Sequence, residues 1–345
     1  MRLANRFERI VVEDDFEQLA PGEVEGRLSR PRVEYYFDRS QSLVSENNSP
    51  DIPFRYSVNP YRGCVHGCSY CYARPTHEYL GFNAGDEFES RVLVKADAPA
   101  LLRKFLSRRA WRCEMIMFSG VTDCCQPAER QFRLTRSCLE VARDFSQPVA
   151  IVTKNALVAR DRELLAEMSR QRLANVAVSL TTLDAQLAGG MEPGTSTPVA
   201  RLRTIRELRE AGVSVQVMIA PIIPGLNDSE VPKLLEAVAE AGAQAASFQL
   251  LRLPLTVRPV FMEWLQRTQP LQAERVEARI RDTRGGALSD ARFGSRMAGE
   301  GEWARQIKQT FDVFARKHGL DRQPPPLDTS RFRVAEADTG QLRLF

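Results

Sequence analysis

Three of the chain's seven cysteines, Cys64, Cys68 and Cys71, lie within eight residues in the spacing Cys-x3-Cys-x2-Cys. A glycine precedes each of the first two cysteines, so the backbone can turn tightly around a central object without a Cβ clash. Three thiolates that converge on one point repel one another unless a metal neutralises them, and soft sulfur ligands select zinc, copper(I) or iron–sulfur clusters. The spacing therefore predicts a metal site.

The number of ligands helps to separate these metals. Structural zinc takes four ligands, usually as two pairs, and the sequence contains no second Cys-x2-Cys pair. Three cysteines suit a [4Fe–4S] cube in which one iron has no protein ligand. A zinc-binding structural module and three plain thiols remain the alternatives at this point.

The same residues resemble the signature of a known family. Cys-x3-Cys-x-aromatic-Cys, with Tyr70 as the aromatic residue, is similar to the motif of the radical S-adenosylmethionine (SAM) superfamily. The resemblance implies a [4Fe–4S] cluster on Cys64, Cys68 and Cys71, with SAM chelating the open iron through its amino and carboxylate groups. It implies an enzyme of lyase or transferase type that cleaves SAM to methionine and a 5′-deoxyadenosyl radical. It also implies a reductant such as flavodoxin or ferredoxin, and it places Tyr70 near the SAM adenine.

Longer stretches resemble one branch of that superfamily, the spore photoproduct lyase-like or "DNA repair photolyase" branch. The resemblance covers about residues 50–255 and is carried by Asn59–Pro75, Phe118–Asp123, Val152–Lys154 and Val178–Thr181. It implies a nucleic-acid substrate. In that branch a hydrogen-donating cysteine lies in the strand-end stretch where Gly120 stands here. Cys124 and Cys125 are therefore the candidate catalytic donors, and the alternative is two cysteines without chemistry.

The composition bounds the remaining possibilities. The chain of 345 residues has 48 basic and 44 acidic side chains, a balance too even to predict a nucleic-acid-binding surface from charge alone. No apolar run is long enough to cross a membrane, and the N-terminus lacks the apolar core of a signal peptide. We therefore expect a cytoplasmic protein without membrane contact, whose cysteines are ligands or free thiols rather than disulfides.

Short apolar strands alternate with amphipathic helices through the middle of the chain. The expected strands are 54–59, Met115–Phe118, Val149–Val152, Val176–Leu180, Val213–Ala220 and Ala245–Leu250, and the expected helices are Ala98–Arg108, Ala128–Phe145, Asp161–Arg170, Pro198–Ala211 and Ser229–Ala241. This alternation favours an α/β fold with a parallel sheet and helical crossovers. Six strands fit the partial (β/α)6 barrel that the resemblance implies.

The rest of the chain divides around this barrel. We expect an N-terminal extension at 1–50, the barrel at 51–255, a helical C-terminal region at 256–322 and an extended tail at 323–345. The last five residues, Gln341–Phe345, resemble the bacterial sliding-clamp-binding peptide, which makes the clamp a candidate partner. An end without function is the alternative.

Polar residues follow the expected strands, at the edge where parallel barrels gather their chemistry. By resemblance, Ser119 and Gly120 occupy the place of a Gly-Gly-Glu-type stretch whose backbone binds the SAM amino group. Thr153 and Lys154 follow the next strand, and Lys154 is a candidate for a SAM carboxylate or ribose contact. Ser179 resembles the serine that the family uses for the same groups.

Two charged residues further along are open to two interpretations. Arg201 either clamps the SAM carboxylate, as arginine does with two parallel hydrogen bonds, or forms a salt bridge with Glu192 that orders the loop over the site. The function has two interpretations as well. The chain is either a radical enzyme acting on nucleic acid or a nucleic-acid-associated iron–sulfur sensing protein without turnover.

Overall fold

The computed structural model describes residues 7–10, 32–323 and 326–334 of the chain. The predicted clamp-binding segment Gln341–Phe345 lies outside these residues, as does most of the predicted N-terminal extension.

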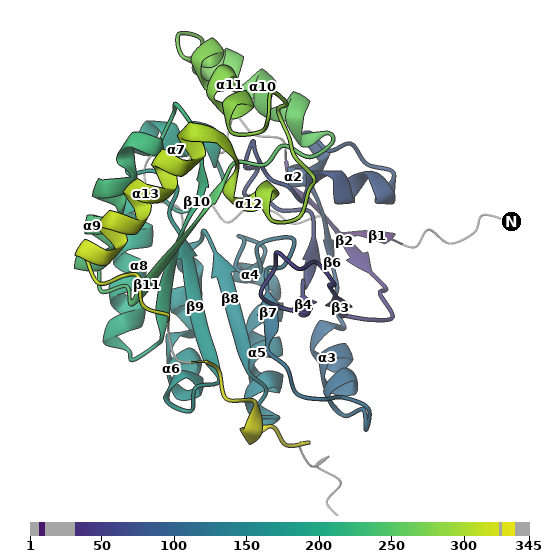
Figure 1. Cartoon of the computed structure of the whole chain (residues 1–345). Coiled ribbons are helices and arrows are strands. Elements are labelled where there is room, and N and C mark those ends of the chain that lie inside the picture. The colour runs from purple at the N-terminus through teal and green to yellow at the C-terminus, as the bar shows by residue number, and fades with distance from the viewer. Residues whose placement is uncertain (1–6, 11–31, 324–325, 335–345) are drawn as a thin grey trace, which may run out of the picture.

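A largely parallel sheet forms the centre of the molecule (Figure 1), with the strand order β11-β10-β9-β8-β7-β4-β3 among the described residues. Its strands are β3 (Val44–Glu46), β4 (Tyr56–Val58), β7 (Ile116–Phe118), β8 (Val149–Thr153), β9 (Ala174–Ser179), β10 (Val215–Ile222) and β11 (Ala245–Leu250). The six strands from β4 to β11 run parallel, and β3 pairs antiparallel with β4 at one edge. All six predicted strands are present, which confirms the partial (β/α)6 barrel. The barrel stays open because β3 and β11 lie at opposite edges of the sheet.

The crossover helices contact one another in chain order along the outside of the sheet. They are α3 (Ala98–Leu106), α5 (Leu134–Asp144), α6 (Arg162–Arg170), α8 (Pro198–Glu210) and α9 (Val231–Glu240), and shorter pieces are α4 (Glu129–Phe132), η3 (Ala156–Asp161), α7 (Ala185–Met191) and η4 (Asp228–Glu230). The single helix predicted at Ala128–Phe145 is two helices, because Arg133 adopts a left-handed φ of 49° between α4 and α5.

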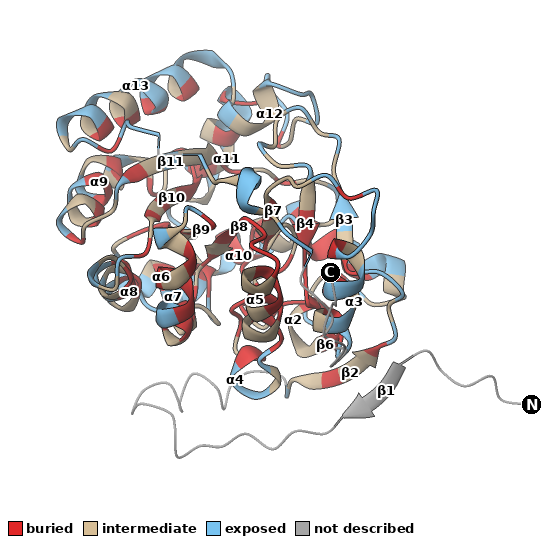
Figure 2. Cartoon of the chain, turned by 90° about the horizontal axis from the view of Figure 1, so that it is seen from below, coloured by how far each residue is buried: buried red, intermediate tan, exposed pale blue. Residues whose placement is uncertain are grey.

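The strands are largely apolar because the buried faces of these helices pack against them. The main core joins strand residues such as Ile116, Val149 and Val217 to helix residues such as Leu139 and Leu235. Figure 2 shows the result: buried segments run through the central strands, and exposed residues face outward on the helices. This core fixes the strand ends that carry the site.

A second, smaller sheet stands beside the first, with the order β1-β2-β6-β5 in the described part of the chain. It consists of β1 (Phe7–Ile10), β2 (Glu34–Asp38), β5 (Tyr61–Arg62) and β6 (Arg91–Val94). The stretch between β5 and β6 holds the cysteine loop, η2 (Arg74–Leu80) and α2 (Glu87–Ser90). Within the expected N-terminal extension at 1–50, residues 34–38 give a strand to the small sheet and residues 44–46 give a strand to the main sheet.

In the C-terminal region, residues 257–298 lie over one end of the main sheet (Figure 1), residues 301–317 pack against α9, and residues 328–333 contact the chain near the opposite end of the sheet. The elements of this region are α10 (Val257–Thr268), α11 (Ala273–Asp282), α12 (Ser295–Ala298), α13 (Gly301–Lys317) and η5 (Thr329–Arg331). Phe261 and Trp264 of α10 share an apolar cluster with Cys68 and Tyr70, so the helical region supports the cysteine loop. None of the described helices has the length and apolarity that a membrane-spanning segment needs.

Candidate cofactor site

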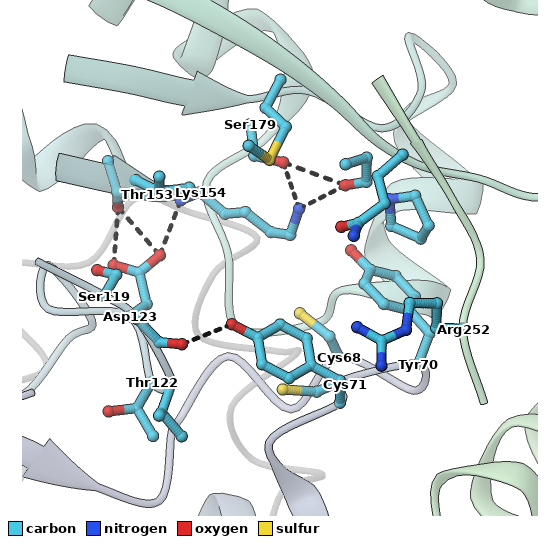
Figure 3. A pocket seen from close by; sticks show the side chains of 18 of the residues that line it. Cys68, Tyr70, Cys71, Ser119, Thr122, Asp123, Thr153, Lys154, Ser179 and Arg252 are labelled. Atoms are coloured by element: carbon cyan, nitrogen blue, oxygen red, sulfur yellow. Dashed lines mark hydrogen bonds between the residues drawn. The ribbon is translucent and has the colours of Figure 1, made fainter. Parts of the chain in front are cut away.

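A cavity of about 440 Å³ opens at the carboxyl ends of the parallel strands, within the size range of small-molecule sites. Its lining comes from the cysteine loop, the ends of β7, β8, β9, β10 and β11, the segment 51–54, and Met297 of α12. Figure 3 shows side chains from these elements pointing toward a common space. The sequence therefore placed the site at the correct edge of the sheet.

All three motif cysteines line this cavity and are free thiols. Cys64 and Cys68 are buried, and Cys71 is half-buried. Burial, followed by the charge of Asp123 and the other two cysteines, raises the pKa of the Cys64 thiol well above its usual range. Burial also raises the pKa of Cys68 and Cys71. Burial outweighs the nearby cations Lys154, Arg201 and Arg74 at Cys68 and Cys71, so the thiols stay protonated without a metal, and this donor set suits a soft, positively charged metal centre.

The loop that carries these cysteines requires its glycines. Gly63 and Gly67 both have a left-handed φ, of 80° and 61°. A Cβ at Gly67 would lie 1.8 Å from an oxygen of Glu89, and one at Gly63 would lie 2.9 Å from the carbonyl oxygen of Phe88. The turn around the cysteines is thus fixed by close backbone approach.

Arg74 binds this loop from behind, a role that the sequence pattern did not indicate. Its buried guanidinium donates to the carbonyl oxygens of Gly67 at 2.9 Å, Cys68 at 3.0 Å, Ala84 at 2.9 Å and Gly85 at 2.6 Å. Since these carbonyls belong to two separate stretches of chain, Arg74 holds the cysteine loop against the segment before α2.

His66 lies between two of the cysteines and is only 2% exposed. Its Nε2 lies 3.1 Å from the amide nitrogen of Asn155, and its Nδ1 lies 3.4 Å from a carboxylate oxygen of Asp123. Burial lowers the pKa of His66, which favours the neutral ring. Asn155 then donates to Nε2, and the Nδ1–H faces Asp123. Because both ring nitrogens are engaged, the histidine does not add a fourth metal ligand.

Asp123 joins the ends of two strands. Its carboxylate accepts hydrogen bonds from the Thr153 hydroxyl at 2.8 Å and from the backbone N–H groups of Lys154 and Cys125, both at 2.8 Å. Thr153 lines the cavity, as predicted for a cofactor-binding residue, but its hydroxyl donates to Asp123. The Thr153 side chain therefore holds the end of β8 against Asp123.

Lys154 and Ser179 lie together on the cavity wall (Figure 3). The ammonium of Lys154 donates to the Ser179 hydroxyl at 2.5 Å and to the carbonyl oxygen of Ala220 at 2.9 Å, and it lies 3.5 Å from a Glu192 oxygen. Both residues were predicted to bind SAM, and a positive charge beside a hydroxyl suits a carboxylate or a ribose.

Glu192 is the hub of a buried network beneath this wall. It accepts hydrogen bonds from the Tyr70 hydroxyl, from the Thr181 hydroxyl at 2.5 Å, and from the Arg201 guanidinium. Burial alone would raise the pKa of Glu192, but Arg201, Lys154 and the two hydroxyls outweigh it and lower the pKa to about 2. Tyr70 is held through its hydroxyl while its ring lines the cavity.

Arg201 does not reach the cavity. It is 1% exposed, pairs with Glu192, and donates to the carbonyl oxygens of Ser179 at 3.0 Å and Ser196 at 2.8 Å. Of the two sequence interpretations, the geometry favours the salt bridge. Arg201 is therefore not placed to bind SAM as predicted, because its donors are committed to the protein.

Ser119 and Gly120 line the cavity at the end of β7. Ser119 has a left-handed φ of 71°, and its hydroxyl accepts a hydrogen bond from the Cys124 N–H at 2.8 Å. The Gly120 carbonyl accepts from the Tyr72 hydroxyl at 2.9 Å. A Cβ at Gly120 would lie 2.6 Å from the Cβ of Ser57, so this position requires glycine. Tyr72, which directly follows the last motif cysteine, is a cavity residue that the sequence analysis missed.

Cys124 and Cys125 are not among the cavity residues. They are 0% and 3% exposed, belong to the main apolar core, and have their sulfur atoms 3.7 Å apart. The prediction that one of them acts as a catalytic donor to a substrate in the cavity does not fit this placement. The chain turns at Ser119 so that Thr122 and Asp123 face the cavity while the two cysteines that follow enter the core.

The outer rim of the cavity was not predicted. It combines Asp51–Phe54 with Gln249, Arg252 and Met297, and the last of these lies outside the predicted barrel segment 51–255. Arg296, next to Met297, pairs with Asp51 at 2.6 Å, and the Gly294 N–H donates to the same carboxylate at 2.7 Å. The barrel alone therefore does not complete the site.

Comparisons with known proteins agree with this geometry. The sequence model described as "Radical SAM superfamily" matches residues 58–238, more than half of the chain. An uncharacterized protein of Mycobacterium tuberculosis is 43% identical over 225 residues, which are 65% of this chain and 66% of that protein. A Radical SAM Nalpha-GlyT isomerase of Pseudomonas phage M6 is 21% identical over 241 residues, 69% of this chain and 48% of that protein. The chain thus spans just under two thirds of the mycobacterial relative.

Solved structures share the fold. Spore photoproduct lyase complexed with dinucleoside spore photoproduct has a TM-score of 0.59 at 17% identity, over 82% of this chain and 78% of that chain. A mutant of the same enzyme with bound AdoMet and the dinucleoside has a TM-score of 0.56 at 18% identity, over 81% and 77%. At this identity the likeness concerns the fold.

Proposed function

Since the chain belongs to the radical SAM superfamily, whose cofactors are a [4Fe–4S] cluster and SAM, we propose that it is an enzyme which binds the cluster through Cys64, Cys68 and Cys71 and abstracts hydrogen from a nucleic-acid substrate. When bound, the reduced cluster supplies the electron that cleaves SAM to methionine and a 5′-deoxyadenosyl radical. The observation that carries this proposal is the set of three free cysteines on one cavity. Among the described cavity residues, His66 is the nearest alternative ligand in sequence, and its ring nitrogens face Asn155 and Asp123.

The chain's own residues bind and orient the cofactor. Lys154 and Ser179 hold the carboxylate or ribose of SAM, since both face the cavity and each offers a polar atom there. The backbone at Ser119 and Gly120 holds the amino group, since both residues line the cavity at the end of β7. Tyr70 gives an apolar wall whose position Glu192 fixes.

The nucleic-acid substrate is supported by two likenesses. The fold is that of spore photoproduct lyase, which is solved with a dinucleoside photoproduct, and the sequence resembles the same branch. A reductant such as flavodoxin or ferredoxin supplies the electron. The tail Gln341–Phe345 stays a prediction for sliding-clamp binding, and equal clamp binding by the full chain and by a chain lacking these five residues would dismiss it.

A direct test uses anaerobically purified full-length protein, reconstituted with iron and sulfide, then mixed with dithionite and SAM. We expect a brown [4Fe–4S] species and formation of 5′-deoxyadenosine. A cluster that forms but yields no 5′-deoxyadenosine would favour the sensing protein, and zinc without iron or sulfide would favour a structural module.

A further inference from the structure

Two hydrogen-bond donors converge on a weak acceptor at the cavity rim. The side-chain amide of Gln249, on β11, donates to the sulfur of Met297, and the Arg252 guanidinium contacts the same sulfur through Nη1 at 3.6 Å. All three residues line the cavity, and Figure 3 shows Arg252 directed into it. A thioether is a poor acceptor, so two good donors are only weakly satisfied.

Arg252 has no carboxylate partner among the described residues. Its buried Nε makes no hydrogen bond there, and burial, followed by the like charge of Arg296, lowers the pKa of the guanidinium. Asp51 lies on the same rim, but its two oxygens accept from Arg296 and from the Gly294 N–H. A half-buried cation without a counter-charge is unfavourable, and a ligand that brings the charge would relieve it.

The neighbouring cavity wall is apolar. Ile52, Phe54, Met117 and Phe248 line the cavity together with Met297. An occupant of this rim therefore meets an apolar surface on one side and two donors on the other. The polar groups assigned to SAM, Lys154 and Ser179, hydrogen-bond to each other and leave Gln249 and Arg252 for a second molecule.

We propose that Gln249 and Arg252 form an oxyanion receptor for the substrate, which carries a phosphodiester or a carboxylate next to an apolar body. Its oxygens replace the Met297 sulfur as acceptors for both donors. A guanidinium binds either oxyanion with two parallel hydrogen bonds, so the receptor fits both sources of negative charge. The inference rests on the proposed function, because it concerns the substrate side of the same cavity.

The test compares two pairs of probes on the reconstituted full chain with SAM, by isothermal titration calorimetry. One pair is thymidylyl-(3′→5′)-thymidine and its neutral methylphosphonate analogue; the other is hippurate and its neutral amide. We expect the anionic member of one pair to bind at least about tenfold more tightly than its neutral partner, the scale of a hydrogen-bonded charge. The pair that shows the preference identifies the source.

Variants connect this preference to the receptor. We expect Arg252→Gln to remove the preference for the anionic probe and Arg252→Lys to retain part of this preference. Gln249→Leu should weaken binding of the anionic probe by about threefold to tenfold, as for one neutral hydrogen bond. Arg258→Gln, which removes the same charge from an exposed position outside the cavity lining, leaves the preference unchanged. Should Arg252→Gln fail to fold, as judged by circular dichroism, the lysine and Gln249 variants carry the test.

Equal binding of charged and neutral probes in both pairs, or a preference that survives in Arg252→Gln, overturns the receptor. The formation of 5′-deoxyadenosine by the unmodified chain is measured on the same samples. Its absence would overturn the proposed function, whereas its presence without any anion preference would overturn the receptor alone.

Discussion

The two ends of the cavity differ in how their polar groups are satisfied. At the cysteine end, Glu192 and Asp123 each accept several hydrogen bonds from the protein, and Arg201 is paired within the network. At the rim, Arg252 and Gln249 share a thioether as their acceptor in the part of the chain that the structure describes. A fully satisfied network holds a fixed shape, which suits a site that binds the same cofactor in every reaction. Unsatisfied donors discriminate between ligands, which suits the place where a substrate is chosen.

The largest effect that this comparison predicts is at the cysteine end. Cys68→Ala removes one of three ligands, and we expect it to abolish the brown absorbance and nearly all bound iron after anaerobic reconstitution. The matched control is Cys113→Ala, which removes a partly buried thiol that does not line the cavity and leaves iron content unchanged. Unchanged iron in Cys68→Ala would refute the ligand assignment.

The second prediction concerns the network behind the cysteines. Glu192→Gln leaves the buried Arg201 without its counter-charge, which costs about 3–5 kcal/mol of unfolding free energy. Because the folded-state pKa of Glu192 is lowered to about 2 from 4.5, its stabilising contribution is present above pH 4.5 and is lost as the pH falls toward 2. The variant should therefore show a flatter pH dependence than the unmodified chain in that window, by urea unfolding.

A surface pair gives the control for this prediction. Glu263 pairs with Arg267 at 2.7 Å, with both side chains 63% exposed. Glu263→Gln should change stability by less than about 0.5 kcal/mol, as for an exposed helix pair. A similar loss of unfolding free energy from both substitutions would show that the buried Glu192 network stabilises the fold no more than an exposed ion pair.

The third prediction tests how tightly the cofactor end is packed. Gly120→Ala places a Cβ 2.6 Å from the Cβ of Ser57, and we expect a loss of about 1–3 kcal/mol by thermal or urea unfolding. Ser57→Gly in the same chain should recover part of this loss. Gly189→Ala, where no atom lies within 4 Å of the added Cβ, should not destabilise. A fully tolerated Gly120→Ala would mean that the wall is looser than described.

The smallest expected effect concerns Cys124 and Cys125, the two core cysteines that follow Asp123. Iodoacetamide should leave Cys124 and Cys125 unmodified in the folded holoprotein, because they are 0% and 3% exposed, while the half-buried Cys113, whose thiol pKa burial raises to about 12, should react slowly and faster at alkaline pH. Mass spectrometry after digestion measures the labelling. Rapid labelling of either core cysteine would show that it is accessible, and would support the interpretation that it donates hydrogen to a substrate in the cavity.

The sequence predicted what depends on local pattern. The six parallel strands were found because each is a short apolar run, and Lys154 and Ser179 were found because they directly follow such runs. The small sheet was missed because its pairing of Glu34–Asp38 with Arg91–Val94 is non-local and its strands are partly polar. The break at Arg133 depends on one backbone torsion that no residue pattern announces.

Within the site, the sequence did not predict which side chains pair with one another. Sequence position made Arg201 a plausible ligand for SAM, but only the folded chain shows that Glu192 and two carbonyls take its donors. Met297 was missed for a different reason. It reaches the cavity through the path of a long connection after α11, and no spacing relates it to the cysteines.

The rim contact between Arg296 and Asp51 joins the start of the barrel segment 51–255 to a segment that follows it. During synthesis the cysteine loop and all six parallel strands leave the ribosome before residues 294–297 exist. Domains fold during synthesis, so the part of the cavity rim that contains Met297 is the last part to form. The rim of the cavity is therefore completed only after residues 294–297 have been synthesised, when the cysteine loop and the six parallel strands are already present.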